Sequence, residues 1–181
     1  MTQAPVVRLV RSSQGRFPHQ KTCFSQNKKT LIKEGNNLYI DSSYNMAEMK
    51  YRKSLEKDQD YFNAAFNLAD AIYKQNRFEE STSLFDALKD NARNNEDLAR
   101  INHNLGNSYL KENKLEQAIE EYKSSLRLNP NDEETRYNLA YAQKMKQQQE
   151  QQQDQQQDEQ EEQQQDQQLS LIHISEPTRL H

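Results

Sequence analysis

The sequence has few of the residues that most folded chains use to make turns and cross-links. It contains one cysteine, Cys23, so an intramolecular disulfide is excluded. Three glycines and four prolines among 181 residues are too few for a sheet protein with many tight turns. No stretch approaches the roughly 20 consecutive apolar residues of a membrane span. The apolar core of a secretory signal is also missing, because Arg8 and Arg11 interrupt the first apolar residues.

Helix-forming residues and unevenly distributed charge make up most of what is present. Only 33% of the residues are hydrophobic and the mean hydropathy is -1.25, so the whole chain cannot be evenly packed. The net charge of -4 is an average over unlike regions. Residues 1–30 carry six basic and no acidic residues, whereas residues 147–168 carry seven acidic residues among glutamines. The net charge therefore says nothing about partners.

The middle of the chain repeats itself. The strings FNLA, HNLG and YNLA, with a weaker copy in KEGNNLY, place small residues at Gly35, Ala69, Gly106 and Ala140. Their spacings are 34, 37 and 34 residues. A period of 34 is the length of the tetratricopeptide repeat, a pair of antiparallel helices. The longer middle spacing indicates three inserted residues, which we place in the polar connection KDNARNNED.

A second set of small residues supports the same unit. Twelve residues after the first three small positions come Ala47, Ser81 and Ala118, and four residues later come three aromatic residues: Tyr51, Phe85 and Tyr122. Small side chains allow helices to cross closely, and the aromatic ring fills the space beside the crossing. A generic helical bundle with chance periodicity is the alternative, and this second alignment argues against it.

These patterns predict an all-α, right-handed superhelical solenoid built from antiparallel helix pairs. We expect helices over residues 27–40, 44–57, 61–75, 78–91, 98–112 and 115–128, and a last helix from about 132 to at least 146. The units then span residues 28–61, 62–98 and 99–132 within a domain of residues 27–146, and residues 133–146 cap it. Pro130 ends the sixth helix, and Asn131 with Glu134 is expected to cap the next one.

Residues 27–146 resemble tetratricopeptide repeat proteins throughout. The segment HNLGNSYLKENKLEQAIEEYKSSLRLNPNDEETRYNLAYAQK, followed at once by glutamines, more narrowly resembles the tetratricopeptide proteins of bacterial Bat (aerotolerance) operons. The resemblance implies a protein-binding scaffold of the bacterial envelope that works beside von Willebrand A-type proteins. Such proteins usually begin with a signal peptide or an anchor, and this sequence departs from them there. Taken literally, its start would place the chain in the cytoplasm.

A repeat array of this kind aligns its first helices along a concave groove. In the register of the family, thirteen first-helix residues face this groove and would contact a peptide or protein partner: Asn36, Tyr39, Phe66, Asn67, Asp70, Tyr73, His103, Asn104, Asn107, Lys111, Tyr137, Asn138 and Tyr141. Asparagine both donates and accepts, so a series of asparagines could hold an extended backbone. Alternatively, Asn67, Asn104 and Asn138 bond only to neighbouring helices.

Other kinds of site find little support. Cys23 and His19 do not make a zinc site without further ligands, no glycine-rich phosphate loop is present, and we expect no cofactor, no metal and no catalysis. Grooves that clamp a chaperone's C-terminal carboxylates use basic residues at positions that here hold Ile32, Phe66 and His103. Arg100 and Lys111 alone do not complete such a clamp. An enzyme with an unrecognised site and self-association through the last helix are the alternatives.

The tails are interpreted separately. The basic segment 1–26 suggests nucleic-acid binding or organelle targeting, but it has no countable amphipathic period, and we prefer a foreign or mis-assigned start. The glutamine-rich, acidic residues 147–168 have no apolar face, so we expect the last helix to extend into them or the segment to be solvated. Their role is either that of an acidic spacer or none, if the segment is a tolerated repeat expansion. The string LSLIHISEPTR matches the translation of a transposon end and adapter used in sequencing libraries. We therefore exclude residues 169–181 from function.

Overall fold

The computed structural model describes residues 27–175, which form seven α-helices and one short 3₁₀ turn. The helices are α1 (Lys28–Ile40), α2 (Tyr44–Leu55), α3 (Phe62–Lys74), α4 (Phe78–Leu88), α5 (Asn95–Lys111), α6 (Leu115–Leu128) and α7 (Glu133–Ser175). The 3₁₀ turn η1 (Lys89–Asn91) follows α4. Residues 27–175 contain no strand, so the predicted all-α class is confirmed.

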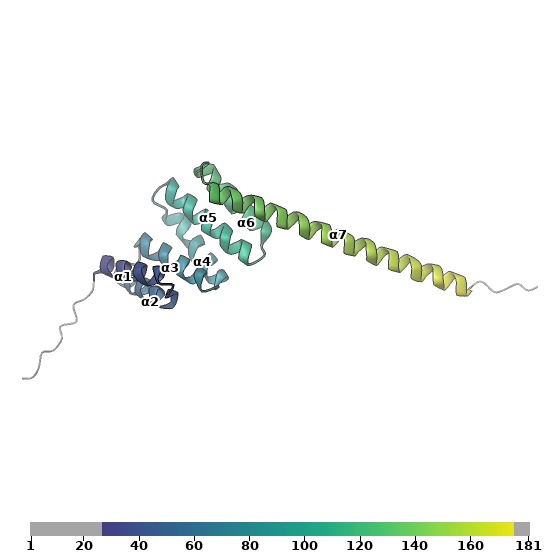
Figure 1. Cartoon of the computed structure of the whole chain (residues 1–181), viewed down its shortest axis with the longest axis horizontal. Coiled ribbons are helices and arrows are strands. Elements are labelled where there is room, and N and C mark those ends of the chain that lie inside the picture. Colours follow the sequence, from purple (N-terminus) through teal and green to yellow (C-terminus); the bar gives the residue numbers. More distant parts are fainter. Residues whose placement is uncertain (1–26, 176–181) are drawn as a thin grey trace, which may run out of the picture.

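The helices are stacked in the order of the sequence. Each helix from α1 to α7 packs against the next one, and α1, α3, α5 and α7 also meet every second neighbour along one side. Figure 1 shows this array as successive pairs, from α1 and α2 at one end to α6 and α7 at the other. The first helices of the pairs therefore share one face, as expected for a solenoid.

The crossing within each pair is set by one small residue and one ring. A Cβ atom added to Gly35 would lie 2.5 Å from the Tyr51 ring, and one added to Gly106 would lie 2.5 Å from the Tyr122 ring. Glycine is required at both positions because the tyrosine occupies the space of a methyl group. The second pair instead combines Ala69 with Phe85, and both are fully buried.

The predicted small residues of the second helices lie where the helices meet. Ala47, Ser81 and Ala118 are completely buried. The Ser81 hydroxyl donates to the Ala69 carbonyl oxygen at 3.0 Å, so this buried polar group is paired. The turn between the two helices of each pair contains one residue with a left-handed backbone conformation, which the sequence patterns did not predict. These residues are Ser42, Asn76 and Asn113, with φ of 57°, 62° and 58°.

Three expectations about local structure need correction. Helix α5 begins at Asn95 rather than 98, so part of the insertion forms an extra helical turn and the boundary at 98/99 falls within a helix. The cap of α7 is Asp132, not Asn131 with Glu134, because the Thr135 amide donates to Asp132 Oδ1 at 3.1 Å. Ala140 is exposed, since no second helix follows to cover it.

Helix α7 continues far beyond the repeats. It runs through the whole glutamine-rich segment to Ser175, and its later part projects away from the array (Figure 1). Side chains from 147 to 157 are exposed, so this part of the helix buries no core. No helix in the described part of the chain is long and apolar enough to cross a membrane.

The expectations for residues 1–26 lie outside the described residues, as do residues 176–181 at the end of the chain. The adapter-derived origin of residues 169–181 stays a prediction. Of that segment, residues 169–175 continue the backbone of α7.

Candidate functional site: a groove along the first helices

Two adjoining hollows follow the face that the first helices share. The first, of about 290 Å³, is lined by residues of α1, α2 and α3: Asn36, Tyr39, Ile40, Tyr51, Asn67 and Asp70. The second, of about 370 Å³, extends from α1 across α3 and α5 to the start of α7 and is lined by Tyr39, Phe66, Asp70, Tyr73, Lys74, Arg100, His103, Asn104, Asn107, Asp132 and Glu134. Tyr39 and Asp70 line both hollows, so the two form one continuous groove.

An asparagine holds neighbouring repeats together at each end of the groove. At the first end, Asn36 Oδ1 accepts a hydrogen bond from the Tyr51 hydroxyl at 2.9 Å and another from Asn67 Nδ2 at 2.9 Å. Each bond joins α1 to a different helix. Asn67 therefore uses one amide hydrogen for structure and keeps its carbonyl oxygen for another partner.

The same arrangement recurs at the other end. Asn107 Oδ1 accepts from the Tyr122 hydroxyl at 2.7 Å and from Asn138 Nδ2 at 3.0 Å. Asn107 also donates from Nδ2 to His103 Nε2 at 3.0 Å. For Asn67 and Asn138, bonding to a neighbouring helix, which the sequence left as the alternative, is present in the structure.

His103 connects this network to the cap of α7. The Thr135 hydroxyl donates to Asp132 Oδ2 at 2.7 Å, so Thr135 Oγ1 is left to accept from His103 Nδ1 at 2.5 Å. Nε2 accepts from the Asn107 amide, so Nδ1 is the ring nitrogen that donates to Thr135. His103 therefore anchors α7 and is held in place, rather than being free for a ligand.

The middle of the groove contains a carboxyl group with a raised pKa, that of Asp70. Burial raises the pKa of Asp70 above its ordinary value, even though a hydrogen bond from the Tyr39 hydroxyl and the charges of Lys74 and Arg100 act in the opposite direction. Burial, with the charge of Asp70 as the second cause, raises the pKa of Tyr51 to about 12. The pKa of Tyr73 is raised by the same two causes. The charge of Asp70 thus affects the ionisation of both of these tyrosines.

The structure brings most of the predicted groove residues together. Those that line the two hollows are Asn36, Tyr39, Phe66, Asn67, Asp70, Tyr73, His103, Asn104 and Asn107. Phe66 belongs largely to the core, with only 6% of its surface exposed, and its ring packs edge-on against Phe85. Lys111, Tyr137, Asn138 and Tyr141 do not line either hollow. Tyr137 and Tyr141 are instead exposed on α7.

The set of groove residues predicted from the sequence leaves out several that line the groove: Ile40, Lys74, Arg100, Asp132 and Glu134. Helical spacing could have found two of them, because Lys74 lies four residues after Asp70 and Arg100 lies four before Asn104 on the same helix faces. Asp132 and Glu134 come from the connection to α7, whose path is set by packing rather than by periodicity.

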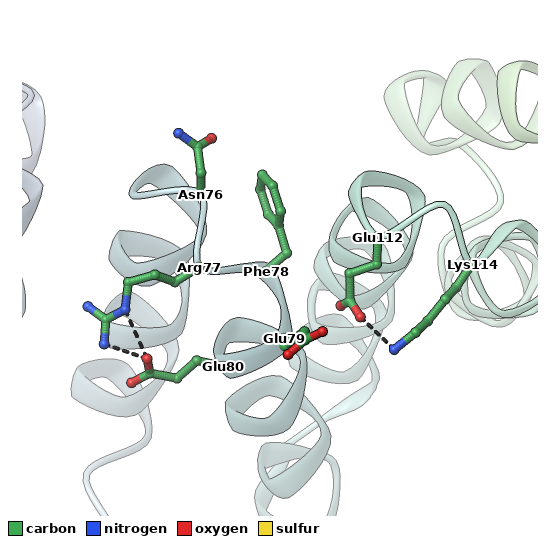
Figure 2. A pocket seen from close by; sticks show the side chains of 7 residues that line it. All are labelled: Asn76, Arg77, Phe78, Glu79, Glu80, Glu112 and Lys114. Carbon is green, nitrogen blue, oxygen red and sulfur yellow. Dashed lines mark hydrogen bonds and ion pairs between the residues drawn. The ribbon is translucent and has the colours of Figure 1, made fainter.

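A hollow larger than either part of the groove lies elsewhere. It has a volume of about 530 Å³ and is lined by the turns of the second and third pairs, at Asn76, Arg77, Phe78, Glu79, Glu80, Glu112 and Lys114 (Figure 2). Figure 2 shows that its charges face one another: Arg77 pairs with Glu80, and Lys114 pairs with Glu112 at 2.6 Å. Because four of the five charged residues that line it are paired within the chain, this hollow offers a ligand less than the groove does.

Within residues 27–175, no group of three or more His, Cys, Asp or Glu side chains is arranged to hold a metal ion. The groove instead presents amide, hydroxyl and aromatic groups with one central carboxylate, which suits hydrogen bonding to an extended chain.

Comparison with known families identifies the repeats. A model described as tetratricopeptide repeat matches residues 34–96, and a second, described as TPR repeat, matches residues 106–147. The chain matches none of the curated proteins with which it was compared.

Solved structures with the same fold include several repeat domains. The first TPR of Spaghetti (RPAP3) bound to the HSP90 peptide SRMEEVD is 23% identical, with a TM-score of 0.61 over 67% of this chain and 94% of that one. MamA from Desulfovibrio magneticus RS-1 is 21% identical, with a TM-score of 0.61 over 66% of each chain. The HSP90 complex of the TPR2AB domain of yeast Sti1 is 23% identical, with a TM-score of 0.62 over 68% of this chain and 48% of that one. At these identities the likeness concerns the fold.

Proposed function

We propose that this chain, a tetratricopeptide repeat protein, is a non-catalytic scaffold that binds an extended segment of a partner protein in the groove along α1, α3 and α5. The observation that carries the proposal is the pair of adjoining hollows on the face shared by the first helices. Similar folds bind peptides, as in the Spaghetti and Sti1 complexes with HSP90 sequences. Groups able to bond to a peptide backbone, including the Asn67 carbonyl and the Asn104 amide, lie along this face.

A capture experiment tests the scaffold. The full chain would be immobilised beside a variant in which Tyr39→Ala removes a lining ring of the groove and Asn104→Lys obstructs it. Bound proteins would be identified from an extract of the source organism. We expect a stoichiometric partner that the wild type retains and the groove variant loses. Binding that is equal for both would contradict the groove, and turnover of a substrate without a protein partner would contradict the scaffold.

The finer proposal is a place in a bacterial envelope complex for aerotolerance, beside von Willebrand A-type proteins. Its support is the resemblance of residues 103–144, with the glutamine-rich segment that follows, to the proteins of Bat operons. Co-expression with a von Willebrand A-type protein encoded next to this gene tests it. Co-purification that depends on the groove supports the assignment, and neighbouring genes of another kind together with no co-purification contradict it.

Self-association is a second candidate, and α7 provides the observation that favours it. Tyr137 and Tyr141 are 72% and 47% exposed, and Ala140 between them is exposed as well. In the three preceding pairs, a second helix covers the equivalent small residue. A chain that dimerises at micromolar concentration in analytical ultracentrifugation, and that Tyr137→Glu keeps monomeric, would support this candidate.

A further inference from the structure

The middle repeat lacks the closed network that the outer repeats share. By position in the repeat, Asn36, Tyr51 and Asn67 correspond to Asn107, Tyr122 and Asn138, and both sets make the same two hydrogen bonds. The corresponding residues of the middle repeat are Asp70, Phe85 and Asn104. An aspartate therefore stands where the outer repeats have the accepting asparagine.

These replacements leave polar groups open in the middle of the groove. Phe85 has no hydroxyl and lies fully buried in the core, so it donates nothing to Asp70. The Asn104 side chain makes no hydrogen bond to any described residue, although it lines the second hollow. Asp70 thus loses both of the donors that its counterparts have.

The nearby cations do not neutralise Asp70. No Lys, Arg or His nitrogen of the described residues lies within 4.0 Å of its carboxylate oxygens, whereas fourteen such pairs occur elsewhere in these residues. The Arg100 guanidinium lies over the Phe66 ring, 4.3 Å from its centre, and the Lys74 ammonium lies 5.7 Å from the centre of the Tyr73 ring. The donor that does reach Asp70 is the hydroxyl of Tyr39.

The first hollow has the remaining features of a site for a cation. Asp70 is the only charged residue that lines it, and Tyr39 and Tyr51 contribute aromatic surface. Aromatic faces attract cations. Ile40, which is 77% exposed at the rim, offers apolar surface for an aliphatic stem. The carbonyl oxygen of Asn67 is a further acceptor, because the structure uses only its amide group.

Resting on the proposed function, we infer that this hollow is the specificity pocket of the groove and takes one lysine or arginine side chain of the bound partner. The ammonium or guanidinium group binds Asp70, and the aliphatic stem lies against Ile40 and Tyr39. The Spaghetti domain, by contrast, binds the acidic peptide SRMEEVD. A groove whose middle carboxylate has no ion-pair partner among the described residues selects the opposite charge.

Selection from a random peptide library tests the inference. Displayed twelve-residue peptides would be selected on the full chain, on Asp70→Asn, and on the matched control Asp60→Asn, which changes an exposed aspartate between α2 and α3. We expect wild type and control to enrich peptides with Lys or Arg at one fixed position, and Asp70→Asn to lose that preference. The best peptide would then be synthesised in two forms, both with an acetylated N-terminus. One form keeps the Lys or Arg, and the other has norleucine at that position.

The expected change is a ten- to hundredfold weaker binding of the norleucine peptide to the wild type, about the value of a charge-assisted hydrogen bond, and no such difference for Asp70→Asn. Circular dichroism would establish that the variant is folded. Enriched peptides without a basic position, or a basic preference that Asp70→Asn keeps, would overturn this inference and leave the scaffold intact. If the wild type enriched no peptide at all, both this inference and the proposed peptide groove would be contradicted.

Discussion

At the scale of single residues, the partly buried carboxyl group of Asp70 makes stability depend on pH. Its pKa is raised by burial, so the folded chain binds its proton more tightly than the unfolded chain does. A group of this kind favours the fold below the ordinary carboxyl pKa of about 4, and that contribution is lost as the pH rises through the raised value. At neutral pH that contribution is reduced or lost.

The first prediction follows from this sign. Asp70→Asn should raise the melting temperature at pH 7, because the amide keeps an acceptor for the Tyr39 hydroxyl and carries no charge. The difference from wild type should shrink as the pH falls towards 4, where the wild-type carboxyl is also neutral. Thermal melts followed by circular dichroism between pH 4 and 7 measure it. A variant that is less stable than wild type at pH 7 would show that Asp70 is structural.

The second prediction separates two asparagines that the sequence treats alike. Asn138 donates to Asn107, whereas Asn104 bonds to no described side chain or backbone group. Asn138→Ala should therefore reduce the free energy of unfolding by about 0.5–1.5 kcal/mol, the usual net value of one hydrogen bond. Asn104→Ala should leave stability unchanged within about 0.5 kcal/mol and weaken partner binding. Urea unfolding with a binding titration checks both, and a marked loss of stability at Asn104 would place it in the structural set.

At the scale of the element, the α5–α6 crossing depends on the absence of one methyl group. Gly106→Ala would bring a Cβ atom to 2.5 Å from the Tyr122 ring, whose hydroxyl is held by Asn107. The ring cannot move without breaking that bond, so we expect a loss of about 1–3 kcal/mol despite the better helix propensity of alanine. Lys111→Ala, at an exposed position of the same helix, is the control and should change stability little. If the two variants were equally stable in urea, α5 and α6 would be able to move apart and accommodate the methyl group without cost.

At the scale of the whole molecule, only the first part of α7 contributes to the fold. Thr135 and Ala142 are completely buried against the array, and Lys146 pairs with Glu116 at 3.1 Å. Farther along, the side chains of residues 151–157 are exposed. The helix thus has a packed beginning and a solvated continuation, and the array needs the beginning because the last pair of a solenoid must be covered.

The fourth prediction tests that division by truncation. A chain that ends after Gln152 should keep the melting temperature of the full chain within a few degrees. A chain that ends after Asp132 should lose at least about 2 kcal/mol, because it uncovers the apolar cluster around Ile119 and Tyr122. Thermal and urea unfolding of the three chains measure the effect. If the first truncation is as destabilising as the second, the glutamine-rich helix is part of the fold.

The sequence by itself determined the repeat, the helix pairs and the crossing residues. Gly35, Ala69 and Gly106, with their rings sixteen residues later, are local and periodic features, so spacing alone reveals them. The faces of the helices follow from the same period, which is why most of the groove residues were predicted.

Tertiary structure alone decided how these groups are used. Whether an asparagine amide is available to a ligand depends on how two helices are aligned. Asn36 and Asn67, for example, are 31 residues apart in the sequence, and no local pattern encodes the alignment that brings them together. Ala140 is exposed because no described helix packs against it, unlike the small residues of the earlier pairs. The isolation of Asp70 depends on Phe85 having no hydroxyl to offer and on Arg100 lying over the Phe66 ring instead, and these contacts exist only once α3, α4 and α5 have come together.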